Sequence, residues 1–250
     1  RVAWQAGAVQ RLAQTGLRFS YADGTSGGLM NLAALLSGQT PDGLAMRWRV
    51  LRPSRFIAAP SLRALRRFPD LDAMGDFDGI TGYIYPHLGI DIDRLRAATG
   101  VTARFNICEF ASKSVLAVPQ DQMSLPKLLA GMSLPILTPA VIEDGRALTD
   151  AVWIKDSNLT ACVLNGANDL WVLWCIGDTP EWRRGALNQY VHMIEMSAIA
   201  ALNAEMAWIA DLNQQIAAGE RPFGHDVPIR VHIIRPALPI PLDPDYVAGK

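Results

Sequence analysis

Cysteine is scarce in this chain, with only three in 250 residues. Cys108, Cys162 and Cys175 are odd in number and show no C-x-x-C spacing, so neither a disulfide framework nor a zinc site is indicated. We expect them to be buried thiols in a reducing compartment, which favours a cytoplasmic protein.

An excess of either charge is also missing, since 23 basic residues face 24 acidic ones and the net charge is -1. Without a basic excess, the sequence gives no reason to expect a nucleic acid as partner. No segment reaches the roughly 18 consecutive apolar residues of a membrane span. Because half of the residues are hydrophobic and only 19% are charged, a disordered chain and a coiled coil are excluded as well.

What is present is an alternation of helical and extended patterns, which is typical of an α/β fold. Residues 40–100 are expected to form helices and loops. We find no internal repeat and no linker, so residues 1–250 are predicted to be one domain. The pattern predicts helices over 1–14, 29–38, 124–132 and 186–218, strands over 17–22 and 229–234, a hairpin over 103–110 and 114–119, and a strand buried on both faces over 170–176.

One motif carries chemistry: Gly24-Thr25-Ser26-Gly27-Gly28 matches G-x-S-x-G between a predicted strand and a predicted helix. In this motif the turn is so sharp that the serine backbone is strained and larger flanking residues would clash. The turn exposes the serine Oγ and directs the start of the following helix at developing negative charge. A plain glycine turn is the alternative explanation.

A serine nucleophile needs a base. His225 is the only loop histidine downstream of Ser26, which makes it the best histidine for a Ser-Asp-His triad. In α/β-hydrolases, however, several strands precede the nucleophile, whereas one helix and one strand precede Ser26 here. The triad esterase therefore ranks second.

Several stretches together resemble the patatin-like phospholipase family. The first twelve residues and FSYADGTSGGLMNLAALLSG resemble that family's opening helix, strand and GTSxGALNA segment. GMSLPILTP, GRALTD and NGAND resemble its A-S-x-x-x-P segment, the approach to its D-G-[GA] motif and its G-A-D stretch, and the closing IRVHIIRPALPIPLD resembles its last strand. Residues 40–100 show no such likeness.

The resemblance implies a three-layer α/β/α fold with a mainly parallel central sheet, and a Ser-Asp dyad that needs no histidine. It makes Ser26 the nucleophile, within an elbow of Gly24, Thr25, Gly27 and Gly28, and Asp150 the base, with Asp156 as a competing base. The implied reaction is hydrolysis of fatty-acyl esters of phospholipids or lysophospholipids through an acyl-enzyme. No metal or organic cofactor is implied.

The sequence departs from the family pattern in two places. Ala151 and Val152 follow Asp150 where the family has glycines, so a catalytically silent lipid-binding domain stays an alternative. The family's glycine-rich oxyanion loop would lie just before Arg1, and we expect a strand ending in glycines upstream of this chain.

A run of arginines around three apolar side chains raises the question of a membrane partner. Such a run is compatible with peripheral contact with anionic lipid headgroups. A solvated helix face is the more frequent explanation, because helical arginines commonly extend over apolar surface. The residues are Arg47, Arg49, Arg52, Arg55, Arg63, Arg66 and Arg67, around Trp48, Leu51 and Phe56.

Overall fold

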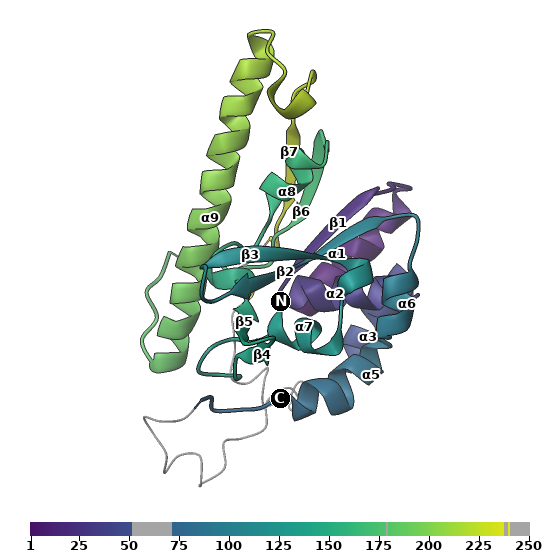
Figure 1. Cartoon of the computed structure of the whole chain (residues 1–250), viewed down its shortest axis with the longest axis vertical. Helices are drawn as coiled ribbons and strands as arrows, with labels where there is room; N and C mark the ends of the chain where they lie inside the picture. Colours follow the sequence, from purple (N-terminus) through teal and green to yellow (C-terminus); the bar gives the residue numbers. More distant parts are fainter. Residues whose placement is uncertain (52–71, 179, 238–239, 241–250) are drawn as a thin grey trace.

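The computed structural model describes residues 1–51, 72–178, 180–237 and 240 (Figure 1). The fold is α/β, as expected, with a central sheet flanked by helices. The helices are α1 (Val2–Gln14), α2 (Gly27–Leu36), α3 (Pro41–Val50), η2 (Ile80–Ile84), α5 (Tyr85–Leu88), α6 (Ile92–Ala97), η3 (Gln120–Gln122), α7 (Leu125–Ala130), η4 (Ala151–Trp153), α8 (Leu159–Leu164), α9 (Ala186–Ala217) and η5 (Pro222–Gly224). The strands are β1 (Tyr21–Thr25), β2 (Thr102–Glu109), β3 (Ser114–Pro119), β4 (Val141–Glu143), β5 (Arg146–Asp150), β6 (Asp169–Leu173) and β7 (Arg230–Ile234).

The larger sheet has five strands, in the order β1-β2-β5-β4 with β3 also paired to β2. Both β1 and β5 pair with one edge of β2, and β3 pairs with the opposite edge. The predicted hairpin is confirmed as antiparallel β2 and β3. Pairing is more mixed than the expected mainly parallel sheet, because β1 runs parallel to β2 while β3 and β5 run antiparallel to it. In the smaller sheet, β6 and β7 pair in parallel.

The way β1 and β5 pair with β2 determines where the last residues of these two strands lie. β1 ends with Thr25 opposite Asn106, and β5 ends with Asp150 opposite Ile107, the next residue of β2. Because β1 is parallel and β5 antiparallel to β2, the two strands approach each other end to end. The residues that follow or close these strands are thereby brought together.

Buried side chains form two hydrophobic clusters. The larger one lies between the five-stranded sheet and the helices α1, α2, α3, α5, α6 and α7, with Phe105 and Leu29 fully buried in it. The second joins α9 to α8, β6 and β7 through residues such as Leu202 and Val163. Figure 1 shows α9 running alongside β6 and β7 on one flank of the molecule.

The predicted short helix after the hairpin is confirmed as α7, and Ser124 is its N-cap, accepting a 3.3 Å hydrogen bond from the Lys127 amide. The strand predicted to be buried on both faces is shorter and alternates between more and less buried residues. Only one face of β6 packs on α8 and α9; on the other, Trp171 stacks on the half-exposed ring of His232. The prediction of burial on both faces was therefore wrong.

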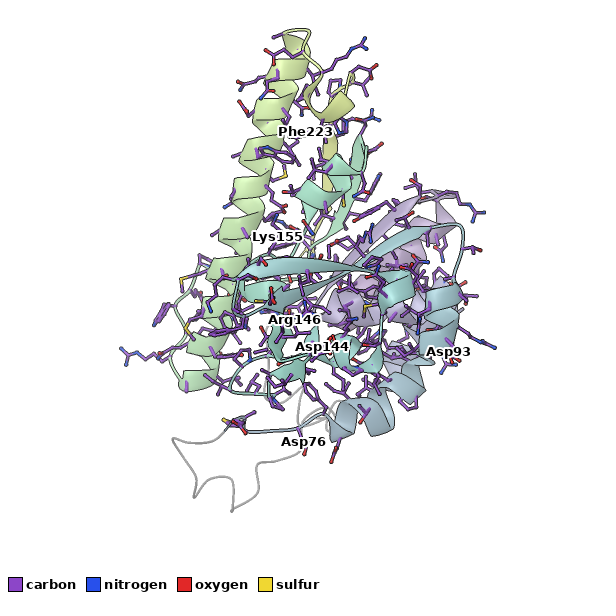
Figure 2. All side chains as sticks on the ribbon, in the orientation of Figure 1. Asp76, Asp93, Asp144, Arg146, Lys155 and Phe223 are labelled. Carbon is purple, nitrogen blue, oxygen red and sulfur yellow. The ribbon has the colours of Figure 1, made fainter. Side chains whose placement is uncertain are left out.

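The long helix α9 has 32 residues and a mean hydropathy of 1.2 in its most apolar window, enough by length and composition to cross a membrane. The search for a run of consecutive apolar residues does not find this helix, because polar residues such as Glu195 and Glu205 interrupt its apolar sequence. Both glutamates are buried and turned towards the rest of the protein. At the far end of α9, Phe223 packs on Trp208 (Figure 2).

Most of the arginine run falls outside the described residues, namely Arg52, Arg55, Arg63, Arg66 and Arg67. Of the two that lie in α3, Arg47 donates hydrogen bonds to the carbonyl of His87 and to Gln39. Arg49 is exposed.

Candidate active site

Ser26 stands at the junction of β1 and α2 with a strained backbone. Its φ of 52° and ψ of -127° lie outside the regions that a side chain with a Cβ normally adopts. Strain of this kind occurs at functional sites, and at a strand-to-helix turn it holds the serine Oγ clear of the sheet. The sharp strand-to-helix turn predicted from the motif is therefore present at Ser26.

Two of the three elbow glycines are required by close contacts. A Cβ on Gly24 would lie 3.0 Å from the Leu29 Cα, and one on Gly27 would lie 2.0 Å from the Val2 Cγ2. At Gly28 the nearest atom would be 3.8 Å away, in ordinary contact with Gln5. The motif pointed to Gly24 and Gly28, whereas the packing of α1 against α2 requires Gly27.

We expect Gly27→Ala to lower the free energy of unfolding by about 1–3 kcal/mol, because the added methyl overlaps Val2. Gly28→Ala is the matched control and should be neutral or stabilise the helix by up to about 1 kcal/mol. Chemical denaturation of both variants and of the double variant Gly27→Ala/Val2→Ala measures how the cost of the Gly27 methyl depends on the Val2 side chain. Equal effects of the two glycine substitutions would contradict this account.

Asp150 closes β5 and is fully buried. Its Oδ1 accepts a 2.9 Å hydrogen bond from the amide of Val152, which fixes the carboxylate at the start of η4. The Ser26 hydroxyl is close enough to lower the pKa of this carboxyl, yet Oδ2 is buried without a partner at full hydrogen-bond geometry. We take the hydroxyl and carboxylate as adjacent but not yet tightly bonded, as is common before substrate binds.

Burial raises the pKa of Asp150 to about 8. The adjacent Ser26 hydroxyl and the hydrogen bond from the Val152 amide oppose this rise in pKa, and the nearby charge of Asp156 adds to it. A carboxyl with a pKa this close to neutrality holds a proton more readily than an ordinary aspartate does, which suits a group that must take and return one.

Asp156, the competing base, lies just beyond η4. Although its residue surface is partly exposed, the surrounding protein desolvates the carboxyl enough to raise its pKa to about 7. Its effect on Asp150 is that of a neighbouring like charge. The structure brings Asp150 to Ser26.

His225 is not placed for a triad. Its ring is buried, with Nδ1 bonded to Asn168 and Nε2 at 2.9 Å from the carbonyl of Val163. These contacts of His225 lie before the start of β6. The other end of β6 is about 13 Å further along the strand. There, the Gln5 side chain of α1 donates a hydrogen bond to the Leu173 carbonyl. Because α1 packs on Gly27, Ser26 belongs to that opposite end. The contacts of His225 therefore do not favour the triad alternative.

The start of α2 faces the site with its amides free of side-chain capping. Ser26 is the N-cap of α2, but its side chain makes no capping hydrogen bond. The Oγ is therefore available for other contacts, and the positive end of a ten-residue helix lies next to it. Within the described ranges, no group of three His, Cys, Asp or Glu side chains could hold a metal ion.

A family model described as patatin-like phospholipase matches residues 1–162, well over half of the chain. The chain belongs to this family. Members of this family are generally hydrolases that act on lipids. A search of curated proteins gave no match.

The patatin-like match includes β1, which ends directly before Ser26, and β5, which ends with Asp150, and the match ends within α8. The second sheet and α9 follow it. The likeness of residues 165–176 and of the closing strand to the family therefore stays a prediction.

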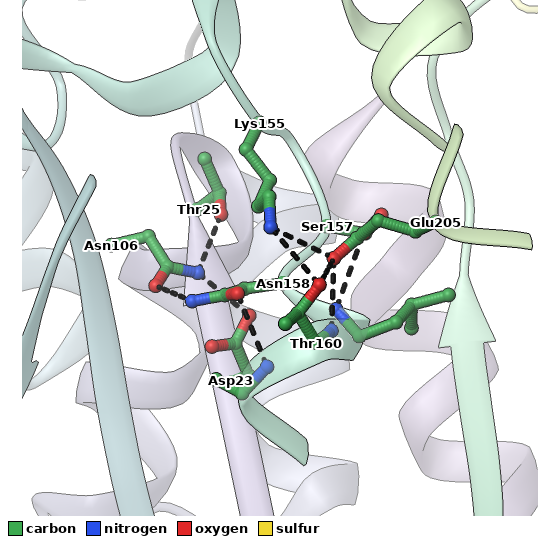
Figure 3. Close-up of polar contacts among 10 residues, drawn as sticks. Asp23, Thr25, Asn106, Lys155, Ser157, Asn158, Thr160 and Glu205 are labelled. Carbon is green, nitrogen blue, oxygen red and sulfur yellow. Dashed lines mark hydrogen bonds and ion pairs between the residues drawn. The ribbon is translucent and has the colours of Figure 1, made fainter. Parts of the chain in front are cut away.

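Beneath the elbow of this patatin-like domain lies a buried polar network that sequence reasoning missed (Figure 3). Asn106, fully buried in β2, donates to Asp23 at 2.7 Å and to Thr25 at 3.0 Å, and it accepts from Asn158 at 3.1 Å. Burial raises the pKa of Asp23 to about 7, against the lowering effect of Asn106. The network links the strand before Ser26 to the segment after Asp150.

Glu205 of α9 holds that same segment from the other side (Figure 3). Its carboxylate accepts from the amides of Leu159 at 3.2 Å and Thr160 at 2.9 Å, and pairs with Lys155 at 3.0 Å. The hydroxyls of Ser157 and Thr160 also donate to it. No local motif announces this contact, since 45 residues or more separate Glu205 from its partners.

Proposed function

We propose that the protein is a serine acyl hydrolase in which Ser26 is the nucleophile and Asp150 its base. The observation that carries the proposal is the strained Ser26 beside a fully buried carboxylate whose second oxygen lacks a partner. Fatty-acyl esters of phospholipids or lysophospholipids are the proposed substrates, in keeping with the family's action on lipids.

The proposed reaction has two halves. Ser26 Oγ attacks the ester carbonyl carbon while Asp150 takes the hydroxyl proton, and the resulting oxyanion faces the start of α2. The carbon–oxygen bond to the alcohol then breaks, and Asp150 returns the proton to that alcohol. Water next attacks the acyl-enzyme, again giving its proton to Asp150, and the fatty acid leaves as Ser26 recovers its proton.

The dyad predicts an unusual pH dependence for an aspartate base. Because only ionised Asp150 can accept the proton and burial raises its pKa to about 8, kcat/KM should rise with pH up to about 8. Asp156→Asn should move the midpoint to lower pH, since it removes a neighbouring like charge. Rates with a soluble ester from pH 5 to 10 measure both. A plateau reached near pH 5 would exclude Asp150 as the base.

Covalent labelling tests the nucleophile directly. A fluorophosphonate should modify the protein at Ser26, as located by peptide mass spectrometry, and Ser26→Ala should prevent the reaction. Hydrolysis of phosphatidylcholine and lysophosphatidylcholine, compared with a short soluble ester, tests the substrate class. A well-folded protein that neither reacts with the probe nor cleaves any ester would instead be a silent lipid-binding domain.

A further inference from the structure

A groove between α1 and α3 lies apart from the candidate active site. The cavity has a volume of about 670 Å³, which is within the range of ligand pockets. Neither Ser26 nor Asp150 lines it. Its lining includes Trp4, Gly7 and Arg11 of α1, Trp48 and Arg49 of α3, and Ile234 at the end of β7.

Gly7 keeps the floor of this groove open. It sits in the middle of α1, where glycine costs about 1 kcal/mol relative to alanine. A Cβ built on Gly7 would meet no atom within 4 Å, so close helix packing does not require the glycine. The groove follows α1 from Ala3 to Leu12, a length of about 14 Å at 1.5 Å per residue.

Among the described residues that line the groove, the charged side chains are Arg11 and Arg49, which carry the same sign. Both are exposed. Arg11 donates one hydrogen bond, to Gln14 at 3.0 Å, and a guanidinium has five N–H donors. The remaining described lining is mainly apolar and includes Trp4 and Trp48. An apolar channel beside two arginines complements a molecule with an alkyl chain and an anionic head.

We propose that this groove binds a single-chain anionic amphiphile, with its chain along Gly7 and its carboxylate or phosphate at Arg11 and Arg49. The site is separate from Ser26, and occupancy requires no hydrolysis.

The test uses the full chain carrying Ser26→Ala, so that turnover plays no part. Tryptophan quenching by 12-bromododecanoate, below its micelle concentration, reports binding beside Trp4 and Trp48, and Trp4→Phe should reduce the signal. Gly7→Leu should weaken binding at least tenfold, because the new side chain occupies the groove while leucine favours the helix. Circular dichroism verifies that this variant is folded.

Charge recognition is tested by a double substitution. Arg11→Gln/Arg49→Gln should weaken binding of 12-bromododecanoate at least tenfold and leave that of 12-bromododecanol within twofold. Dodecyl phosphate should compete with the carboxylate, and Arg18→Gln/Arg221→Gln, which removes two exposed arginines elsewhere, should change nothing. Equal affinity for acid and alcohol, or unchanged binding in folded Gly7→Leu, would overturn the proposal. If the wild-type protein hydrolyses no ester but still binds 12-bromododecanoate, the proposed hydrolase function is refuted and the proposed groove site is retained.

Discussion

Asp150→Asn should lower kcat/KM for ester hydrolysis roughly a thousandfold or more, because the amide cannot accept the Ser26 proton. The substitution preserves the shape of the side chain, and its carbonyl oxygen can still accept the Val152 amide. Loss of activity would therefore not reflect loss of the fold. Steady-state rates and the rate of fluorophosphonate labelling of Ser26 should fall together.

Asp156→Asn is the matched control, since it makes the same chemical change six residues away. It should keep most of the activity at pH 9, where Asp150 is largely ionised in either protein. If Asp156→Asn were inactive and Asp150→Asn active, the two aspartates would have to exchange roles.

Asp150→Asn should also make the protein more stable than the wild type in alkaline solution. The pKa of Asp150 is raised in the folded state to about 8 from an ordinary 3.8, so the folded protein binds the extra proton between these values. Stability from this group is therefore complete below about pH 4 and is lost as pH rises through 8. Asp150→Asn does not have this loss, so at pH 9 its free energy of unfolding should exceed that of the wild type by on the order of 2–5 kcal/mol. Denaturation of both proteins at pH 5 and pH 9 measures it.

Local patterns predicted the elements with the strongest periodicity. The hairpin, α7 with its Ser124 cap, and the long α9 lie where the sequence placed them. β1 begins and ends later than predicted, because Asp23 and Gly24 look like turn residues but pair with β2 up to Asn106. Strand ends depend on a partner strand distant in the sequence, which no local signal reveals.

The site divides in the same way. The motif was sufficient to place Ser26 at a strained elbow, since the sharp turn is a local property. Asp150 came from a resemblance, and its proximity to Ser26 follows from the meeting of β1 and β5 along β2. His225 was the best histidine for the alternative triad because it was expected to lie in a loop, a criterion that contains no information on which end of the strands the loop occupies. Asn106 and Glu205 were missed because their partners lie far away in the chain.

Glu205→Ala should reduce the free energy of unfolding by about 3–5 kcal/mol, the usual cost of removing one partner from a buried ion pair. The carboxylate is 5% exposed and pairs with Lys155, so alanine would leave that charge partly buried without its partner. It would also leave the amides of Leu159 and Thr160 without their acceptor at the start of α8.

Glu205→Gln should have an intermediate effect. Each carboxylate oxygen accepts from a backbone amide, Oε1 from Thr160 and Oε2 from Leu159, and the amide group of glutamine can serve only one of them. Glu220→Ala, at an exposed acidic residue just after α9, should change stability by no more than about 0.5 kcal/mol. Chemical denaturation of the three variants provides the comparison.

The effect should reach Ser26 as well as the fold. Glu205 fixes the segment that carries Asn158, Asn158 donates to Asn106, and Asn106 donates to Thr25, which directly precedes Ser26. Folded Glu205→Ala should therefore react more slowly with a fluorophosphonate at Ser26, whereas a clamp that served stability alone would leave the labelling rate of the folded fraction unchanged. Asn106→Ala, which removes the middle of this path, should slow labelling without touching α9. If both variants are destabilised but label at the normal rate, α9 supports the domain without positioning its serine.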